Sequence, residues 1–224
     1  MSKFAGSARS DILGSMSAPE PGLRELKKQM TRENIAGAAL QLTLEKGLDS
    51  VTVDEIAQLA FVSPRTVSNY FSSKDEAVVA AGTPDWLEVV DTFGARGEGE
   101  RPLTTLCELF SEFVGTRTPE QLRVALQIVD LVDRYPSLRP HQTAAYDTLE
   151  EALRARVADL TGTDVENDVY PWLVAAAAVS AVRSSVRIWG RAGAKPDQLP
   201  ELLQTAFNQF SDGLPSPRPA GSAD

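Results

Sequence analysis

The chain has 224 residues, of which 42% are hydrophobic and 24% charged, enough for one small and one larger domain with apolar cores. Its single cysteine, Cys107, and single histidine, His141, exclude an intrachain disulfide and a Cys/His zinc site, and no cofactor is expected. The net charge of −9 is unevenly distributed: residues 1–74 hold nine Lys/Arg and eight Asp/Glu (net +1), and the other 150 hold 13 and 23 (net −10). The acidity belongs to the second part, so the first part remains compatible with an anionic partner.

The two ends of the chain are predicted to be disordered. Residues 1–22 are rich in Ser, Ala, Gly and Pro, and residues 213–224 have a similar composition. The first 17 residues contain no long apolar run that would form a signal peptide. The longest weakly polar run, 170–182, is too short for a membrane span, so we expect a cytoplasmic protein without membrane contact.

The first helix is predicted over about 31–46, where Ile35, Ala38, Ala39 and Leu42 recur at helical spacing. Basic residues cluster just before or within it, and one of them, Lys28, is a candidate phosphate contact. The alternative is that this cluster is an ordinary solvated helix end.

Three helix starts follow within about two dozen residues. Thr52 and Glu55 have the spacing of a capping box, Ser63 precedes Pro64 as an N-cap, and Ser73 begins the third helix. Helix starts this close together leave room only for short helices and short turns, an arrangement typical of a helix-turn-helix.

The second of these short helices carries side chains that can contact DNA. Arg donates to guanine, Asn to adenine and Ser or Thr to either, whereas Tyr and Lys at its end suit phosphate. Backbone N–H groups at the two helix starts also suit phosphate. The candidate DNA-binding residues are Thr52, Ser63, Pro64, Arg65, Thr66, Ser68, Asn69, Tyr70, Lys74 and Lys28. A merely solvated polar face would account for Arg65 and Asn69 alone, but few other structures use a capped pair this short.

These residues resemble the TetR family of bacterial regulators. The resemblance rests on Gly-x-x-x-x-Thr-Val-x-x-Ile-Ala from Gly47, on Val-Ser-x-x-Thr from Val62, and on Tyr-Phe-x-Ser-Lys from Tyr70. It implies an all-α fold, with an N-terminal three-helix DNA-binding domain (23–80) and a C-terminal helical ligand-binding and dimerisation domain (81–212). One departure is Phe61, which stands in the turn where the family usually has Gly. Either the turn takes another conformation, or Phe61 bears strain and packs on a neighbour.

In the second domain we expect a short helix near Trp86 and five longer ones at 103–116, 120–134, 137–160, 164–189 and 200–214, with a polar loop at 94–101. The stretch 135–139 and the Ala-rich helix ending at Trp189 look similar to a subgroup of actinobacterial regulators. That subgroup is described as binding acyl-CoA-like ligands and includes the mycofactocin regulator.

The last two predicted helices carry enough apolar surface for a second subunit. The helix at 164–189 is apolar on most sides, and the one at 200–214 has an apolar stripe. In the family the last two helices form a four-helix dimer interface, so we expect a homodimer that reads a near-palindromic operator. The residues assigned to this interface are Val179, Val186, Leu203, Phe207 and Phe210.

A ligand pocket among helices needs apolar walls and a few polar anchors. The candidates are Trp86, Phe110, Phe113, Gln127, Tyr146, Trp172 and Arg183. For the aromatic residues, plain core packing is the alternative. Arg183 interrupts an apolar helix, and it could bind an anionic ligand, pair with Asp130 or Asp133, or reach solvent.

The leading hypothesis is a repressor that binds double-stranded operator DNA as a dimer. A small apolar or acyl-CoA-like effector would release it from the DNA. Two alternatives remain: a DNA-binding regulator without a small-molecule ligand, and a helical binding protein or enzyme. The enzyme alternative is disfavoured because the sequence holds no Ser-His-Asp, Cys-His or metal constellation.

Overall fold

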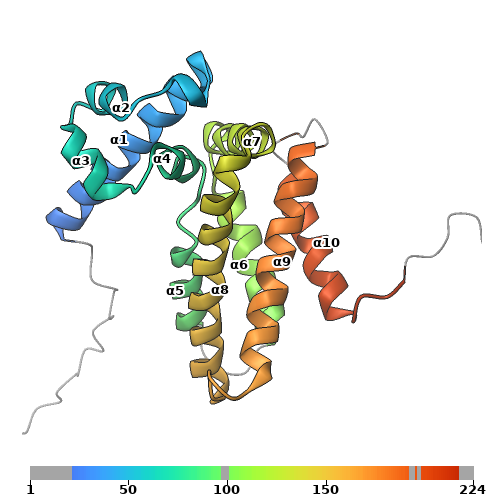
Figure 1. Cartoon of the computed structure of the whole chain (residues 1–224). Coiled ribbons are helices and arrows are strands. Elements are labelled where there is room, and N and C mark those ends of the chain that lie inside the picture. Colours follow the sequence, from blue (N-terminus) through green and yellow to red (C-terminus); the bar gives the residue numbers. More distant parts are fainter. Residues whose placement is uncertain (1–21, 97–100, 192–194, 196–197, 217–224) are drawn as a thin grey trace, which may run out of the picture.

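The computed structural model describes residues 22–96, 101–191, 195 and 198–216, and all regular structure in these ranges is helical. The elements in chain order are α1 (Leu23–Lys46), η1 (Leu48–Ser50), α2 (Val53–Leu59), α3 (Pro64–Tyr70), α4 (Lys74–Ala80), α5 (Leu87–Ala95), α6 (Pro102–Gly115), α7 (Pro119–Arg134), η2 (Pro136–Leu138), α8 (Arg139–Thr161), α9 (Val169–Arg191) and α10 (Gln198–Ser211). Helices α1 to α4 form one end of the molecule and α5 to α10 the other (Figure 1).

The first domain has its own core, in which α1 packs on α4 and on the α2–α3 pair. Ile35 and Ala39 of α1, Ile56 of α2 and Val67 of α3 are all buried there. Ala57, also buried, is small enough to let α2 and α3 approach each other closely. The all-α fold with an N-terminal helix-turn-helix is therefore confirmed.

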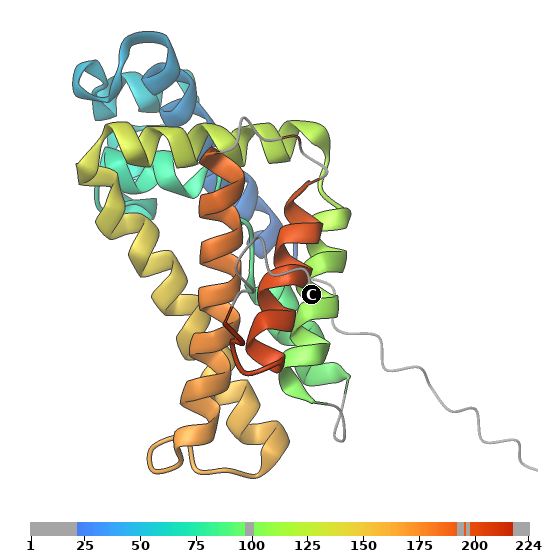
Figure 2. The ribbon, with the colours of Figure 1, turned by 90° about the vertical axis from the view of Figure 1, so that its right-hand side faces the viewer.

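The second domain is a bundle in which α8, α9, α10 and α6 run along one another, with α5 packed on α6 and α8. Helix α7 lies across the upper ends of the bundle, between it and the helix-turn-helix (Figure 2). The bundle core is apolar and contains Phe110, Leu153, Val182, Trp189 and Phe207.

Helix α7 divides its apolar residues between the two cores. Ile128, Leu131 and Val132 belong to the core of the first domain, whereas Leu122 and Leu126 pack against the core of the second. The predicted domain boundary after residue 80 therefore separates the first core from the α7 side chains that help to form it. At Gly82 the contact is tight, because a Cβ there would lie 2.4 Å from the Ile128 Cγ1.

One helix in the described part of the chain, α9, is long and apolar enough to cross a membrane by length and composition alone. This differs from the sequence prediction, in which the Ala-rich run was too short. Its buried side chains, among them Val182 and Trp189, fill the bundle core between α8 and α10. We therefore interpret α9 as a core helix of the second domain.

Several boundaries differ from those predicted from the sequence. Helix α1 begins at Leu23 rather than near 31. Its first two turns were not predicted because Leu23, Leu26 and Met30 are exposed and give no apolar periodicity. The segment before Val169 is not α-helical, and α10 ends at Ser211 rather than at 214. The predicted disorder of residues 1–21 and 217–224, and half of the predicted loop (97–100), lie outside the described residues.

Candidate DNA-binding interface

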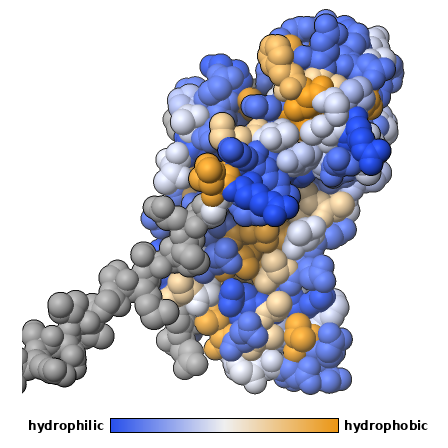
Figure 3. All heavy atoms as spheres, turned by 90° about the vertical axis from the view of Figure 1, so that its left-hand side faces the viewer, coloured by the Kyte–Doolittle hydropathy of each residue, from blue (hydrophilic) through white to orange (hydrophobic). Residues whose placement is uncertain are grey.

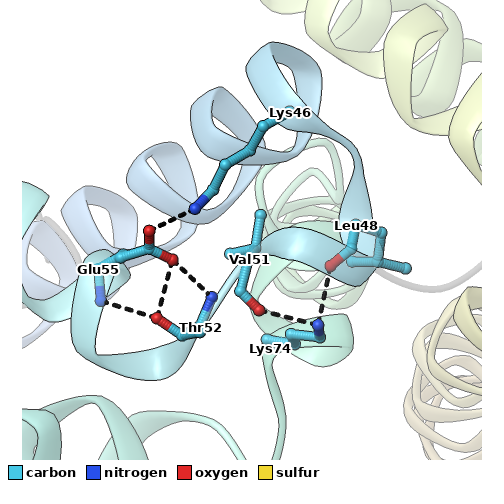
Figure 4. A network of polar contacts seen from close by, with 6 residues as sticks. All are labelled: Lys46, Leu48, Val51, Thr52, Glu55 and Lys74. Carbon is cyan, nitrogen blue, oxygen red and sulfur yellow. Dashed lines mark hydrogen bonds and ion pairs between the residues drawn. The ribbon is translucent and has the colours of Figure 1, made fainter.

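The start of α2 is organised by a network around Glu55 (Figure 4). Thr52 Oγ1 accepts from the Glu55 backbone N–H at 3.3 Å, and a Glu55 carboxylate oxygen accepts from the Thr52 N–H at 3.0 Å, which confirms the capping box. Lys46, the last residue of α1, forms an ion pair with the same carboxylate. These contacts with Lys46, and then those with Thr52, lower the pKa of Glu55 to about 2, so the network is ionised at neutral pH.

Lys74, predicted to grip phosphate, is engaged inside the domain. Its ammonium donates to the carbonyl oxygens of Leu48 and Val51, each at 2.8 Å (Figure 4). These bonds connect the first turn of α4 to η1 and to Val51, which has an extended backbone between η1 and α2. We therefore revise the role of Lys74 from phosphate contact to positioning residue.

The recognition helix α3 is built as predicted. Ser63 accepts from the Thr66 N–H at 3.0 Å, Pro64 occupies the first turn, and Val67 is buried against α2. Arg65, Ser68 and Asn69 are exposed on one face of this helix. Among the residues described, neither Arg65 nor Asn69 has a hydrogen-bond or ion-pair partner, so both side chains are available to an outside ligand.

The other predicted contacts of α3 are less free. Thr66 Oγ1 shares a 2.8 Å hydrogen bond with Ser63 Oγ, and Ser68 Oγ donates back to the Pro64 carbonyl. Tyr70 is half-buried at the end of the helix, packed against the first core. Ser63, Thr66 and Ser68 can still offer hydroxyl lone pairs, because each remains at least partly exposed.

A shallow groove between α1 and α3 adjoins this face, lined by Glu25, Lys28, Gln29, Arg32, Asn69 and Tyr70. Lys28 is exposed and makes only a 4.0 Å contact with Glu25, so its charge is available to phosphate. Arg32 has a different role: it donates to the Tyr70 carbonyl at 3.4 Å and lies 4.5 Å over the Phe71 ring. It fixes the C-terminal end of α3, which the sequence analysis did not foresee because the partners are 38 and 39 residues away.

The turn between α2 and α3 forms a Schellman motif. The Val62 N–H bonds to the Ala57 carbonyl at 2.9 Å, and the Phe61 N–H bonds to the Gln58 carbonyl at 3.3 Å. Phe61 takes the left-handed position with φ 55°, and its side chain is 95% exposed. The predicted alternative of another turn conformation is therefore wrong, and so is the expectation that the ring packs on a neighbour.

In the second domain, three predicted ligand residues form an aromatic cluster. Trp86 lies 5.5 Å from Phe110 and 5.2 Å from Phe113 between ring centroids, and Phe110 stacks on Phe207 at 6.0 Å. Phe110 and Phe113 are buried in the bundle core. The cluster thus has a packing role in the bundle core.

The four other candidates do not form one cluster, although Arg183 lies close enough to Tyr146 to affect its pKa. Trp172 is exposed near the start of α9, donates to the Val165 carbonyl at 2.9 Å and has Arg154 over its ring at 3.8 Å. Gln127 is half-buried on α7. Arg183 is exposed without a described ion pair, and the predicted partner Asp130 pairs with Arg134 instead. Of the three alternatives for Arg183, exposure to solvent fits this placement best.

Tyr146 is the most strongly perturbed of these candidates. Burial raises the pKa of the Tyr146 phenol to about 12, against a lowering by the positive charge of Arg183. The phenol therefore stays protonated at neutral pH and can donate a hydrogen bond. Ser185, which the sequence analysis missed, is buried on α9, and its hydroxyl has no hydrogen-bond partner in the part of the chain that is described.

Three of the predicted dimer-interface residues lie inside a single protomer. Val179, Leu203 and Phe207 are buried in the bundle core, so a partner subunit cannot reach them. Val186 and Phe210 are half-buried against the same core. The apolar side chains that α9 leaves exposed are Val169, Tyr170, Trp172, Leu173 and Ile188. Helical periodicity alone shows that a face is buried, but it does not show which surface covers that face.

Contacts between the two domains converge on the start of α4. Ser73, the N-cap of α4, shares a 3.2 Å hydrogen bond with the lone histidine, His141 of α8. Ser137 of η2 donates to Asp75 at 3.4 Å. These contacts, which the sequence analysis did not predict, join the helix after the recognition helix directly to the second domain.

Comparisons with known proteins agree with this geometry. Residues 35–81 match the model of the bacterial regulatory proteins of the tetR family, and residues 100–215 match the MftR C-terminal domain. The transcriptional regulator TcmR of Streptomyces glaucescens is 29% identical over 214 residues, covering 93% of each chain. MftR of Mycobacterium tuberculosis, the proposed mycofactocin biosynthesis regulator, is 25% identical over 84% of this chain and 93% of its own.

Among solved structures, the repressor FadR of Thermus thermophilus in complex with lauroyl-CoA has the same fold. It aligns with a TM-score of 0.53 and 21% identity, covering 86% of this chain and all of its own. These relatives are transcriptional regulators, not enzymes. The chain therefore belongs to the TetR family of DNA-binding bacterial transcriptional regulators, and its second domain is of the MftR C-terminal type.

Proposed function

We propose that the protein is a cytoplasmic repressor that binds a near-palindromic operator as a homodimer and leaves it when a small apolar effector occupies the second domain. The observation that carries the proposal is the exposed face of α3, where Arg65 and Asn69 have no partner among the described residues. A guanidinium and an amide at neighbouring positions of a recognition helix suit bidentate contacts to guanine and adenine. Lys28 beside them supplies a phosphate contact that positions the helix.

We place the dimer contact on the outer face of α9. Leu173 and Ile188 are 61% and 54% exposed, and small side chains such as Ala177 and Ser180 lie between them on that face. Small residues between larger apolar ones allow a helix of a second subunit to approach closely. A two-fold axis there would present two α3 helices to half-sites about one DNA turn apart.

The polar groups that best suit an effector come from two helices packed along each other, α8 and α9. Tyr146 offers a protonated phenol, and Ser185 offers a buried hydroxyl without a described partner. A buried unsatisfied hydroxyl is unfavourable, and a bound carbonyl or thioester oxygen would satisfy it. Acyl-CoA is the first class to test, because the FadR structure holds lauroyl-CoA.

Release of DNA requires an effector that binds the two conformations with different affinity. Helix α7 is the element that would transmit the change, since Leu126 faces the bundle core and Ile128 faces the core of the first domain. A shift of α7 would press on Gly82, where the contact is already tight, and would move α4 and α3 with it.

The test is fluorescence anisotropy with a labelled duplex from the DNA upstream of the gene for this chain, with and without lauroyl-CoA. We expect tight binding that lauroyl-CoA reverses and that lauric acid and coenzyme A separately do not. Tyr146→Phe and Ser185→Ala should weaken the response to lauroyl-CoA and leave binding without it unchanged. Failure to bind the duplex above the level of random DNA contradicts operator recognition at that site.

A second candidate, a regulator controlled without a small molecule, is favoured by the aromatic cluster. Trp86, Phe110 and Phe113 pack on one another and on the core rather than standing apart as pocket walls. Tight DNA binding that ignores lauroyl-CoA and a panel of other apolar or planar compounds would select this candidate.

A further inference from the structure

Phe61 is the residue whose conformation and exposure are hardest to explain from the isolated chain. It has φ 55° in the turn between α2 and α3, and its side chain is 95% exposed. The left-handed region is unfavourable for a bulky side chain, and Gly or Asn adopts it far more readily. The exposed ring gains nothing from burial, so neither its backbone nor its side chain stabilises the free protein.

Backbone hydrogen bonds hold the turn, and with it the left-handed conformation of Phe61. Both Schellman hydrogen bonds are present, Val62 N–H to the Ala57 carbonyl and Phe61 N–H to the Gln58 carbonyl. The motif needs a left-handed residue at Phe61 and would form more easily with glycine there. A benefit that compensates for phenylalanine must therefore come from a state that the isolated chain does not show.

The position of Phe61 indicates what that state is. It lies two residues before Ser63, the N-cap of α3, and four before Arg65. The chain between α2 and α3 lies on the side of the molecule away from the bundle (Figure 1). Seen from that side, the surface is mostly hydrophilic with isolated apolar patches (Figure 3). In a helix-turn-helix, the N-terminal residues of the second helix contact base edges while the first helix crosses the backbone. The turn that joins them therefore faces the edge of the major groove.

We propose that the Phe61 ring contacts operator DNA, packing on the apolar C–H surface at the groove edge, from deoxyribose or from a thymine methyl. The proposal rests on the operator binding proposed above. Phenylalanine is among the side chains that pack on the thymine methyl group. Because the contact is apolar, it releases no counterion, unlike a lysine on phosphate.

The test uses the full-length protein and a duplex enriched from a random library by the wild type. Phe61→Asn removes the ring but tolerates the left-handed backbone, so it should unfold at the same temperature as the wild type or higher. We expect it to bind the enriched duplex about tenfold more weakly, with an unchanged dependence on salt. Leu214→Asn is the matched control, because Leu214 also has a positive φ (54°) and is 61% exposed, but follows α10.

Replacing thymine by deoxyuridine near the half-site edge distinguishes the two apolar surfaces. A tenfold loss for Phe61→Asn with a matching loss on the deoxyuridine duplex assigns the thymine methyl, and a loss for the variant alone assigns the sugar. Wild-type affinity in Phe61→Asn, or an equal loss in Leu214→Asn, overturns the inference while leaving operator binding intact. If the wild type enriches no duplex, operator binding itself is contradicted and the inference with it.

Discussion

At the scale of single residues, two lysines of the first domain have different roles although both are basic residues near α3. Lys74 donates to the carbonyl oxygens of Leu48 and Val51, which holds η1 against α4. Lys28 is exposed at the groove beside Asn69 and has only a weak ion pair. Charge alone therefore does not identify a DNA contact, because the Lys74 ammonium is held inside the domain by two of its three N–H donors, whereas that of Lys28 is exposed.

This difference predicts that substitution of one lysine lowers stability and substitution of the other lowers DNA affinity. Lys74→Met should lower the free energy of unfolding by about 1–3 kcal/mol, because the Val51 carbonyl loses the Lys74 donor and the Leu48 carbonyl keeps only the Val51 N–H. Lys28→Gln should leave stability unchanged but lower DNA affinity and reduce the slope of log affinity against log salt by about one. Urea denaturation and salt titration of DNA binding measure the two effects. A reduced salt slope in a fully folded Lys74→Met would restore the phosphate role.

The exposed pair on α3 predicts a loss of specificity as well as affinity. Arg65→Ala or Asn69→Ala should each cost about 1–3 kcal/mol in specific binding, since each removes a potential bidentate base contact. Both side chains are exposed and unpaired in the described structure, so stability should not change. Competition between the enriched duplex and single-base variants measures the effect. Unaltered preference at every base in both variants would mean that α3 is not the reading helix.

At the scale of elements, caps determine where the short helices begin. The α2 capping box, the Ser63–Pro64 start of α3 and the Ser73 start of α4 are all local patterns, and the structure confirms each of them. Helix α2 has only seven residues, too few to be stable alone, so its start depends on Glu55 and on the link to Lys46.

The Glu55 network predicts a pH-dependent contribution to stability. Its pKa is lowered from 4.5 to about 2 in the fold, so the unfolded chain takes up the proton first as the pH falls. The stabilisation is thus complete above pH 4.5 and is lost progressively towards pH 2. The difference in Tm between the wild type and Glu55→Gln should be largest near pH 6 and shrink by pH 3. Glu45→Gln, at an exposed site on α1, is the control, and a difference independent of pH would contradict the assignment.

The sequence predicted the features that depend on neighbours in the chain and missed those that depend on distant ones. Caps and apolar spacing lie within four residues of each other, so α2, α3 and α4 could be located closely. The partners of Lys74, Arg32 and Ser73 lie between 23 and 68 residues away, and no local pattern encodes them. The extra turns of α1 were missed because their apolar residues face solvent rather than a core.

At the scale of the whole molecule, two cores share one helix. Ile128 and Leu131 of α7 complete the core of the first domain, and α7 also lies against the bundle (Figure 2). Hydrogen bonds from η2 and α8 to the start of α4 add a second connection. The domains are therefore joined by packing as well as by the chain, and the contacts from the second domain reach α4, the helix that follows α3.

The surface available to a second subunit follows from what the bundle has already buried. Phe207 of α10 is 1% exposed, stacks on Phe110 and fills the protomer core. Leu173 and Ile188, in contrast, are exposed on α9. A charge at Phe207 would be forced into an apolar interior, but a charge at Leu173 or Ile188 would remain hydrated in the monomer.

This contrast predicts how three substitutions separate dimerisation from folding. Leu173→Glu and Ile188→Glu should give helical monomers with near-normal Tm and no tight operator binding, because a lone α3 reads only one half-site. Phe207→Glu should instead lower the free energy of unfolding by several kcal/mol, since it buries an unpaired carboxylate. Light scattering, circular dichroism and anisotropy on the same samples distinguish these outcomes. A Leu173→Glu, Ile188→Glu double variant that remains dimeric would move the interface away from α9, and a well-folded monomeric Phe207→Glu would return it to α10.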